Sequence, residues 1–245
     1  MEMREIHHLS EVSCDRDWEL DDSGWSANAW MSTLDLKIIE TALSRLVENR
    51  ARALRCFEWG SGRSTLHFSK LLDGLASPTT WISAEYDRGW FEEFWSNSKP
   101  TSCCKIYHME HPFTSNKPDP GINFLLYDYG RLLPMKREFS HHRYVEMKDY
   151  VNSIGLFSTE FDFIFVDGRK RNQCLFAASQ KIKRDGLVFL HDAWRPYYAL
   201  GATFFQTTIR VGDSLMVGSH MPLVDLLEFI NIEHFGAANQ TRWIL

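Results

Sequence analysis

The sequence predicts an α/β protein built on a doubly wound, mostly parallel sheet with an antiparallel hairpin near the C-terminus. The segment Ala53–Trp59 is apolar apart from Arg55 and Glu58, as a buried parallel strand should be, and a glycine turn (Gly60–Gly62) and a helix follow it at once. Later, two strand-like segments flank Gly212-Asp213, which is a strong hairpin signal. The first pattern indicates a strand–helix unit of a parallel sheet, and the second adds antiparallel strands to it.

Composition and charge limit the class of protein. A chain of 245 residues, 44% hydrophobic and 14% aromatic, is long enough for one α/β domain with a substantial core. The net charge of −5 gives no support for nucleic-acid binding, which needs a basic excess, so we expect no nucleic-acid partner. No apolar run approaches the roughly 20 residues of a membrane span, so we expect no membrane partner.

Cysteine usage and the N-terminus favour a cytoplasmic protein. The cysteines form no C-x-x-C pair, and reduced thiols are the simplest interpretation; they are Cys14, Cys56, Cys103, Cys104 and Cys174. The first residues carry acidic, basic and histidine side chains and no apolar run, so a signal peptide is not expected.

The first elements follow from the periodicity of the apolar residues. A helix is expected over Ser32–Val47, capped by Ser32. After the first strand, Ser64 or Thr65 is placed to cap a second helix. A strand, a short aromatic helix and a third strand follow, at Thr80–Glu85, Trp90–Trp95 and Cys103–Met109.

The segment 112–160 departs most from a minimal α/β domain. Its first half, Pro112–Pro134, is punctuated by proline and glycine and is expected to be loop-like. Its second half, Tyr144–Ile154, has apolar residues on one helical face. Tyrosines and basic residues in this segment suit a lid over a polar or anionic substrate, and a solvated insertion packed on the sheet edge fits equally well.

The remaining elements complete the sheet. Two strands that end in acidic residues are expected at 161–167 and 186–192, a short helix at Ala193–Leu200, and hairpin strands at Thr203–Val211 and Ser214–Ser219. A final amphipathic helix with Leu223 and Ile230 on its apolar face covers either the sheet edge or a partner subunit, so a homo-oligomer is possible. The expected organisation is an N-terminal segment (1–31), the main domain (32–220) and a helical extension (221–245).

The glycine turn argues against a dinucleotide. A dinucleotide fingerprint needs a third glycine or alanine at the position of Thr65, and here the acidic Glu58 also lies just before the first glycine. Glu85, which ends the second strand, lies 23 positions after Gly62. An acid at that distance is placed to accept both hydroxyls of a ribose.

With these motifs the chain resembles the class I S-adenosylmethionine-dependent methyltransferases. The resemblance rests on four segments in order, 58–65, 83–87, 161–169 and 186–192. It implies a Rossmann-like fold of seven strands with S-adenosyl-L-methionine as cofactor. It places the cofactor on the glycine loop and the acids at the strand ends: Glu58, Gly60, Ser61, Gly62, Ser64, Thr65, Glu85, Glu110 and Asp167.

The acids left over at the strand ends point to the acceptor side. His191 is the candidate general base, because a histidine titrates near neutral pH, and Asp167 and Asp192 are its candidate catalytic partners. The two aspartates suit Mg²⁺ as well, but a third oxygen ligand is not evident, so no metal site is assigned. Arg169 is the candidate clamp for an anionic acceptor group. An arginine of the 169–171 cluster that instead pairs with Asp167 or Asp192 is an equal alternative.

The sequence therefore predicts an S-adenosylmethionine-dependent methyltransferase that acts on a small polar or anionic molecule, with O-methylation favoured. Two alternatives remain open at this point. One is an aminopropyl-type transferase on the same fold, because the glycine-loop acids do not distinguish it. The other is a non-catalytic, methyltransferase-like binding module.

Overall fold

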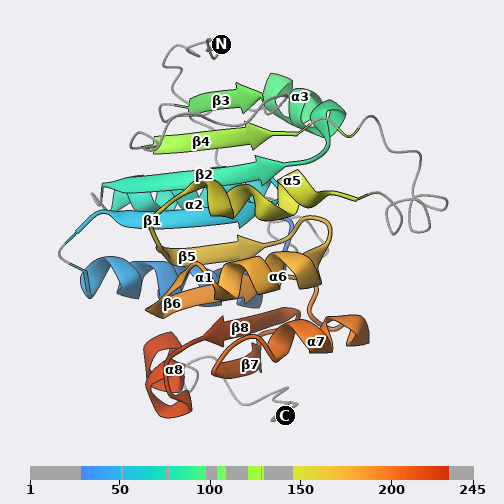
Figure 1. Ribbon diagram of the computed structural model, residues 1–245. Coiled ribbons are helices and arrows are strands. Elements are labelled where there is room, and N and C mark those ends of the chain that lie inside the picture. Colours follow the sequence, from blue (N-terminus) through green and yellow to red (C-terminus); the bar gives the residue numbers. More distant parts are fainter. Residues whose placement is uncertain are drawn as a thin grey trace.

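The computed structural model describes residues 29–50, 52–75, 78–97, 104–108, 121–127, 129 and 146–231. Within them the chain forms one twisted eight-stranded sheet in the order β3-β4-β2-β1-β5-β6-β8-β7, with helices on both faces (Figure 1). The strands are β1 (Leu54–Trp59), β2 (Thr79–Glu85), β3 (Cys104–His108), β4 (Gly121–Leu126), β5 (Phe161–Val166), β6 (Ile182–Leu190), β7 (Thr207–Val211) and β8 (Leu215–Ser219). The doubly wound, mostly parallel sheet is therefore confirmed.

The direction of the strands follows the prediction. The neighbouring strands from β3 to β6 all pair in parallel, whereas β8 pairs antiparallel with both β6 and β7. The hairpin turn falls at Gly212, whose φ of +61° favours glycine. The C-terminal ends of the parallel strands consequently meet at one edge, where ligands bind in open α/β sheets.

Helices cover the two faces of the sheet. On one face α1 (Thr33–Glu48), α2 (Arg63–Gly74) and α8 (Leu223–Ile230) pack on Phe163, Phe165 and Phe189, and α3 (Arg88–Asn97) adds Phe91. On the other face lie α5 (Lys148–Val151), the 3-10 helix η1 (Asn152–Leu156), α6 (Arg171–Ser179), the 3-10 helix η2 (Pro196–Tyr198) and α7 (Ala199–Ala202). Figure 1 shows α5, α6 and α7 in front of the sheet. The sheet is thus a central layer between two apolar cores.

Hydrogen bonds determine where α1 begins and how α1 contacts the hairpin and α8. The Ser32 hydroxyl accepts a hydrogen bond from Asp35 N at 3.1 Å, so Ser32 caps α1 as predicted. The carboxylate of Asp35 then accepts bonds from Asp213 N at 2.7 Å and from the Ser214 hydroxyl at 2.6 Å. Arg45 donates to the last carbonyls of α8, at Glu228 and Phe229. The final helix therefore docks on α1, and α1 anchors the hairpin.

Four predictions about elements need correction. The helix expected at Ala193–Leu200 is a turn followed by the 3-10 helix η2 and the one-turn helix α7. The second helix begins at Arg63 with Gly62 as its N-cap, and Ser64 and Thr65 lie inside the helix, where their hydroxyls donate to Glu58. Thr65 Oγ1 also accepts a hydrogen bond from Gly62 N at 3.0 Å, so Thr65 supports the helix start from its third position. The first half of the 112–160 segment is not all loop, since β4 pairs with β2 and β3 in the sheet and brings the strand count to eight. The helix expected up to Ile154 is in the described part only one turn, α5, continued by η1.

A buried ion cluster closes the opposite end of the sheet. Asp162, which is fully buried in β5, lies 2.8 Å from Arg50 Nη1 and 2.6 Å from Lys183 Nζ, and it accepts a hydrogen bond from Arg55 N. Two cations and a backbone N–H donor compensate its buried charge. The cluster therefore joins β1, β5 and β6 at this end of the sheet. No helix among the described residues has the length and apolar character to cross a membrane.

Candidate active site

The glycine turn after β1 is built for close approach. Gly60 has a φ of +95°, and a Cβ there would come within 2.7 Å of the backbone nitrogen of Gly168, so the β1 and β5 loops touch at this point. A Cβ at Gly62 would meet nothing within 4 Å. Gly60 therefore serves backbone packing, whereas open space lies beside Gly62.

Glu58 lies inside the protein, beneath the turn. Its carboxylate is 0% exposed and accepts hydrogen bonds from four side chains, Ser64, Thr65, Trp81 and Ser83, at 2.6 to 3.0 Å. Burial raises its pKa to about 7, against the four donors that lower it. Glu58 ties β1 to β2 and to the start of α2. Its assignment to the cofactor remains a prediction, because all of these partners belong to the chain itself.

Glu85 ends β2 and holds the glycine loop. One carboxylate oxygen accepts from the backbone N–H and the hydroxyl of Ser61 at 2.8 and 2.9 Å. The other accepts from the N–H groups of Tyr86 and Asp87 at 2.8 and 2.9 Å. The side chain is 2% exposed, and burial raises its pKa to about 7 in spite of these donors. A carboxylate has about four acceptor positions, so a ribose hydroxyl requires the Ser61 hydroxyl to turn away.

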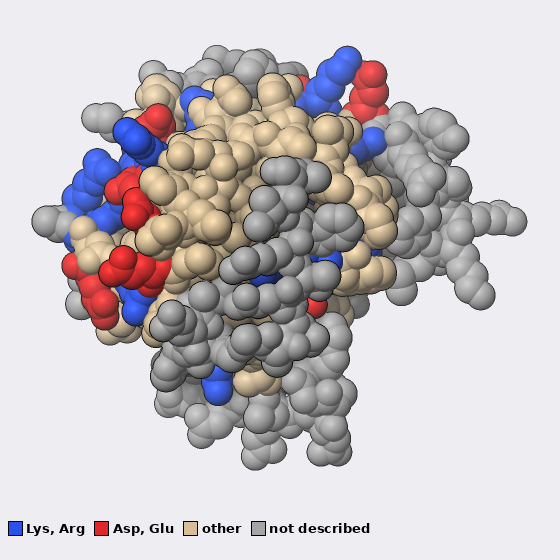
Figure 2. Space-filling model, turned by 90° about the horizontal axis from the view of Figure 1, so that it is seen from below, with Lys and Arg blue, Asp and Glu red and all other residues tan. Residues whose placement is uncertain are grey.

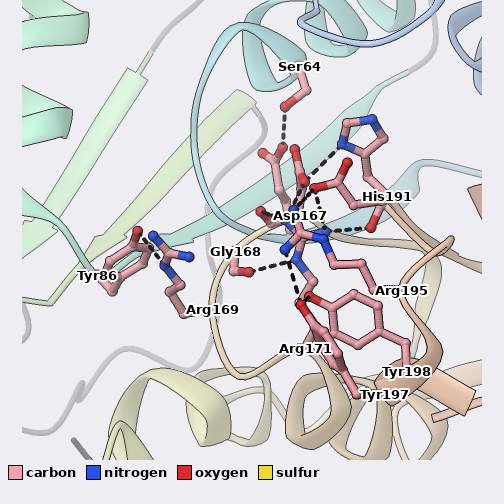
Figure 3. A network of polar contacts seen from close by, with 12 residues as sticks. Ser64, Tyr86, Asp167, Gly168, Arg169, Arg171, His191, Arg195, Tyr197 and Tyr198 are labelled. Atoms are coloured by element: carbon pink, nitrogen blue, oxygen red, sulfur yellow. Dashed lines mark hydrogen bonds and ion pairs between the residues drawn. The ribbon is translucent and has the colours of Figure 1, made fainter. Parts of the chain in front are cut away.

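The ends of β5 and β6 bring His191 and Asp167 together. His191 Nδ1 lies 3.0 Å from Asp167 Oδ1, and His191 is 6% exposed (Figure 3). Burial lowers the pKa of His191, but the charge and hydrogen bond of Asp167 outweigh burial, and the pKa is raised above its ordinary value. For Asp167, burial raises the pKa, and the charges of His191 and Arg171 outweigh it and lower the pKa. The two groups therefore form an oriented pair.

Arg171 locks this pair in place. Its guanidinium donates to the backbone carbonyls of Asp167, Gly168 and His191, and its Nη2 lies 3.0 Å from Asp167 Oδ1 (Figure 3). Its Nη1 lies 3.6 Å from Asp192 Oδ2, which Arg195 Nη2 also approaches at 3.0 Å. The alternative in which an arginine of this cluster holds the loop is confirmed for Arg171.

Backbone conformation marks the same two loops. Lys170, just before α6, and Asp192, just after β6, both take left-handed φ values, +55° and +56°. Non-glycine residues adopt such values only where the surroundings impose them, and they gather at functional sites. Here the conformation places Asp192 against both Arg171 and Arg195.

Asp167 and Asp192 do not present an open metal site, since Arg171 lies between the two carboxylates. No group of three or more histidine, cysteine, aspartate or glutamate side chains suited to a metal ion occurs in the described part of the chain. Arg171 and Arg195 are thus the cations that pair with these two aspartates.

Arg169 points away from this pair, toward the β2 loop. Its Nε donates to the Tyr86 hydroxyl at 3.2 Å, and its guanidinium lies 5.9 Å from the Tyr86 ring centre (Figure 3). Its two terminal nitrogens have no partner among the described residues. Glu110, one of the predicted cofactor-binding residues, lies outside the described residues.

Aromatic residues near the glycine loop were not assigned from the sequence as a group. Trp90 Nε1 donates to the carbonyl of Ser61 at 3.1 Å, and its ring lies 5.9 Å from that of Trp30. The guanidinium of Arg63, the first residue of α2, lies 5.3 Å from the Trp30 ring. Only the position of Trp30 before the first helix hinted at this arrangement, because the contacts join three separate parts of the chain.

The strand order defines the fold. A parallel sheet whose last strand pair is antiparallel, with β8 between β6 and β7, is the class I methyltransferase arrangement with one added strand on the β3–β4 side. The chain has the class I methyltransferase fold. No protein-family model matches the sequence, and no curated protein does.

Solved structures similar to this chain are distant. Human methyltransferase-like protein 13 in complex with SAH is 13% identical with a TM-score of 0.46, over 86% of this chain and 96% of that one. A methyltransferase-like protein from Silicibacter pomeroyi is 18% identical with a TM-score of 0.44, over 80% and 93%. Spermidine synthase from Thermotoga maritima is 15% identical with a TM-score of 0.45, over 77% of this chain and 60% of that one.

Proposed function

We propose that this chain is an S-adenosylmethionine-dependent methyltransferase that acts on a small polar or anionic acceptor, with a hydroxyl as the methylated group. The observation that carries the proposal is the buried His191–Asp167 pair, 3.0 Å apart, at the strand ends beside the glycine turn. A base next to a cofactor turn is the arrangement that removal of a proton during methyl transfer requires.

The described residues fit the cofactor at two points. The open space beside Gly62 leaves room for a ligand against the backbone, and Glu85 presents a buried carboxylate to a ribose once the Ser61 hydroxyl turns away. When bound, the cofactor supplies an activated methyl group. Ser61 and Gly62 would hold its methionine end, with Glu58 supporting the loop from below through Ser64 and Thr65.

His191 is the group that takes the acceptor proton in this proposal. Asp167 accepts the hydrogen bond of Nδ1, which leaves Nε2 as the nitrogen that receives a proton. Because the pKa of His191 is raised, the imidazole must lose its own proton before it acts as a base. We therefore expect activity to rise with pH above the ordinary histidine range.

In this proposal Arg169 supplies charge to the part of the acceptor that lies over the β2 loop, away from His191. Its terminal nitrogens are without partners in the described part of the chain, while Nε is fixed by Tyr86. A guanidinium held in this way presents two parallel donors to a carboxylate or phosphate. A small acceptor with one such group fits this position.

Titration calorimetry with S-adenosylhomocysteine tests the cofactor. We expect micromolar or tighter binding, and at least about tenfold weaker binding to Gly62→Val, whose branched side chain enters the open space. Gly62 has an extended φ of 172°, so valine is tolerated by the backbone. Gly155→Val, also placed where a Cβ meets nothing within 4 Å, is the matched control and should bind normally. Failure of the wild-type protein to bind would refute the proposed function.

The base is tested with an acceptor that supports turnover. His191→Ala should reduce the rate by roughly 10²–10⁴-fold and leave S-adenosylhomocysteine binding intact. His67→Ala, which removes a histidine of α2 that pairs with Glu40 of α1, is the control and should leave the rate unchanged. Normal turnover by His191→Ala would remove His191 from the mechanism.

A further inference from the structure

A second pocket lies beyond the His191 loop, between the segment after β6, α7 and the β7–β8 hairpin. Its walls are mainly apolar and include Ala193, Pro196, Ala199, Ala202, Ile209 and Met216. It is open at the surface and has a cavity volume of about 70 Å³, which suits a small ring or a short chain. In Figure 2, which views the molecule from the hairpin side, uncharged residues make up most of the described central surface.

This pocket is distinct from the proposed acceptor site. Its lining contains none of His191, Asp167 and Arg169. Tyr198, which does line it, lies on the far side of Arg171, whose guanidinium is 5.7 Å from the Tyr198 ring. The Arg171 network of Figure 3 therefore separates the two places.

One cation in the pocket wall is not neutralised. Arg210, in the middle of β7, pairs across the hairpin with Met216, and both residues line the pocket. Arg210 has no hydrogen-bond or ion-pair partner in the described part of the chain, and burial lowers its pKa. A guanidinium partly removed from water without an anion is unfavourable, so an anion delivered to it is favoured.

Two further polar side chains of the wall already have partners. Arg195 lies 3.0 Å from Asp192 Oδ2 and donates to the Tyr197 hydroxyl at 3.1 Å. The Thr208 hydroxyl donates to the carbonyl of Ala202 at 2.8 Å. The pocket consequently offers apolar walls and one free positive charge.

We propose that this pocket binds a small apolar monocarboxylate, in which a ring or short chain fills the apolar walls and the carboxylate pairs with Arg210. A planar guanidinium matches a carboxylate through two parallel hydrogen bonds. A single free cation favours one negative charge, and the shortage of further free donors disfavours sugars and polyanions. The proposal does not rest on the methyltransferase function, because it uses neither the glycine turn nor His191.

Calorimetry on the full chain with phenylacetate and its neutral isostere phenylacetamide tests the proposal. We expect phenylacetate to bind one site with a millimolar or lower dissociation constant, and phenylacetamide to bind at least about tenfold more weakly. Arg210→Gln should show the same loss for phenylacetate. Arg184→Gln, an exposed arginine in β6, is the matched control and should bind as the wild type does.

Several results would overturn the proposal: no binding of phenylacetate at millimolar concentration, equal affinity for acid and amide, or unchanged affinity in Arg210→Gln. If Arg210→Gln does not fold, two other measurements decide. One is the comparison of phenylacetate with phenylacetamide in the wild-type protein, and the other is Arg210→Lys, for which we expect a partial loss of phenylacetate affinity. Amide chemical shifts that move at Ala202 and Thr208 would support the location. Shifts confined to Arg169 and Tyr86 would contradict it.

Discussion

At the scale of single residues, the site depends on buried charges that have assigned partners. Asp167 Oδ1 contacts both His191 and Arg171. The carboxylate therefore orients the imidazole and also helps to anchor the loop. Glu58 and Glu85 differ from it, because their partners are hydroxyl, indole and backbone donors without a cation. The consequence is that the pKa of Glu58 and of Glu85 is raised while that of Asp167 is lowered, although β2, β1 and β5 lie side by side in the sheet.

The titration of His191 should depend on Asp167. Burial alone lowers the pKa of the imidazole, and the Asp167 carboxylate reverses this effect. In Asp167→Asn we expect the pKa of His191 to fall below the wild-type value, which itself lies above about 6.5. NMR titration of the histidine ring protons measures the change without any acceptor.

The remote substitution Asp185→Asn is the control, since that exposed residue contacts Arg50 at the other end of the sheet. In a pH profile of the methyl-transfer rate, the increase in rate should occur at lower pH in Asp167→Asn than in the wild type. The maximal rate should also be lower, because the His191 ring loses its orienting partner. An unchanged His191 pKa in Asp167→Asn would show that the pair does not exist in solution.

At the scale of elements, most of the sheet could be predicted from the sequence because β1, β2, β5 and β6 are largely apolar and have an acid at or just after their C-terminal ends. The strand β4 could not, although Ile122, Phe124 and Leu126 alternate within it, because prolines and glycine dominate its N-terminal side. Its stability comes from pairing with β2 and β3, which are distant in the sequence. Similarly, His191 and Asp167 were identifiable at strand ends, but the choice of Arg171 over Arg169 as their anchor depends on how α6 begins.

The anchoring of the hairpin by α1 gives a prediction at this scale. Asp35 accepts hydrogen bonds from Asp213 N, Ser214 N and the Ser214 hydroxyl at 2.6 to 3.3 Å. Asp35→Ala leaves two backbone donors without acceptors, so we expect a loss of about 2–4 kcal/mol in the free energy of unfolding. Urea denaturation measures it, and amide hydrogen exchange in β7 and β8 should accelerate.

Asp35→Asn retains one carbonyl oxygen and should recover part of this loss. Equal stability of the alanine variant and the wild type would mean that water replaces the carboxylate and that α1 does not anchor the turn. The hairpin carries Arg210 and Met216 of the second pocket, so Asp35→Ala should also weaken phenylacetate binding.

At the scale of the whole molecule, the two ends of the sheet differ in the groups that compensate their buried acids. At one end, Asp162 is neutralised by Arg50 and Lys183, and the ion cluster joins β1, β5 and β6. At the other end, Asp167 and Asp192 are also paired with cations, but Glu58 and Glu85 are buried with neutral donors only, under the loops that the proposed cofactor would contact. Stability at the ligand end should therefore depend on pH in a way that is set by these two acids.

Glu58→Gln tests this dependence. Burial raises the pKa of Glu58 in the folded protein to about 7, from an unfolded value near 4.5. An acid whose pKa is raised by folding stabilises fully below the unfolded pKa, and this contribution is lost as the pH rises through the folded pKa. The loss should be on the order of 3 kcal/mol between pH 4.5 and pH 8. Glutamine cannot ionise, so the stability of the wild type relative to Glu58→Gln should fall by this amount.

Urea unfolding at pH 5 and pH 8 measures the difference in unfolding free energy between the wild type and Glu58→Gln. The contribution of Glu85 cancels in this difference, because both proteins contain Glu85. The exposed Glu48→Gln reports what such a substitution does outside the core. At pH 5 the variant should be the less stable protein, because an amide nitrogen replaces one acceptor among the four donors of Glu58. A difference between wild type and variant that stays constant with pH would show that Glu58 is ionised throughout, and that a cation or water reaches it from the glycine turn.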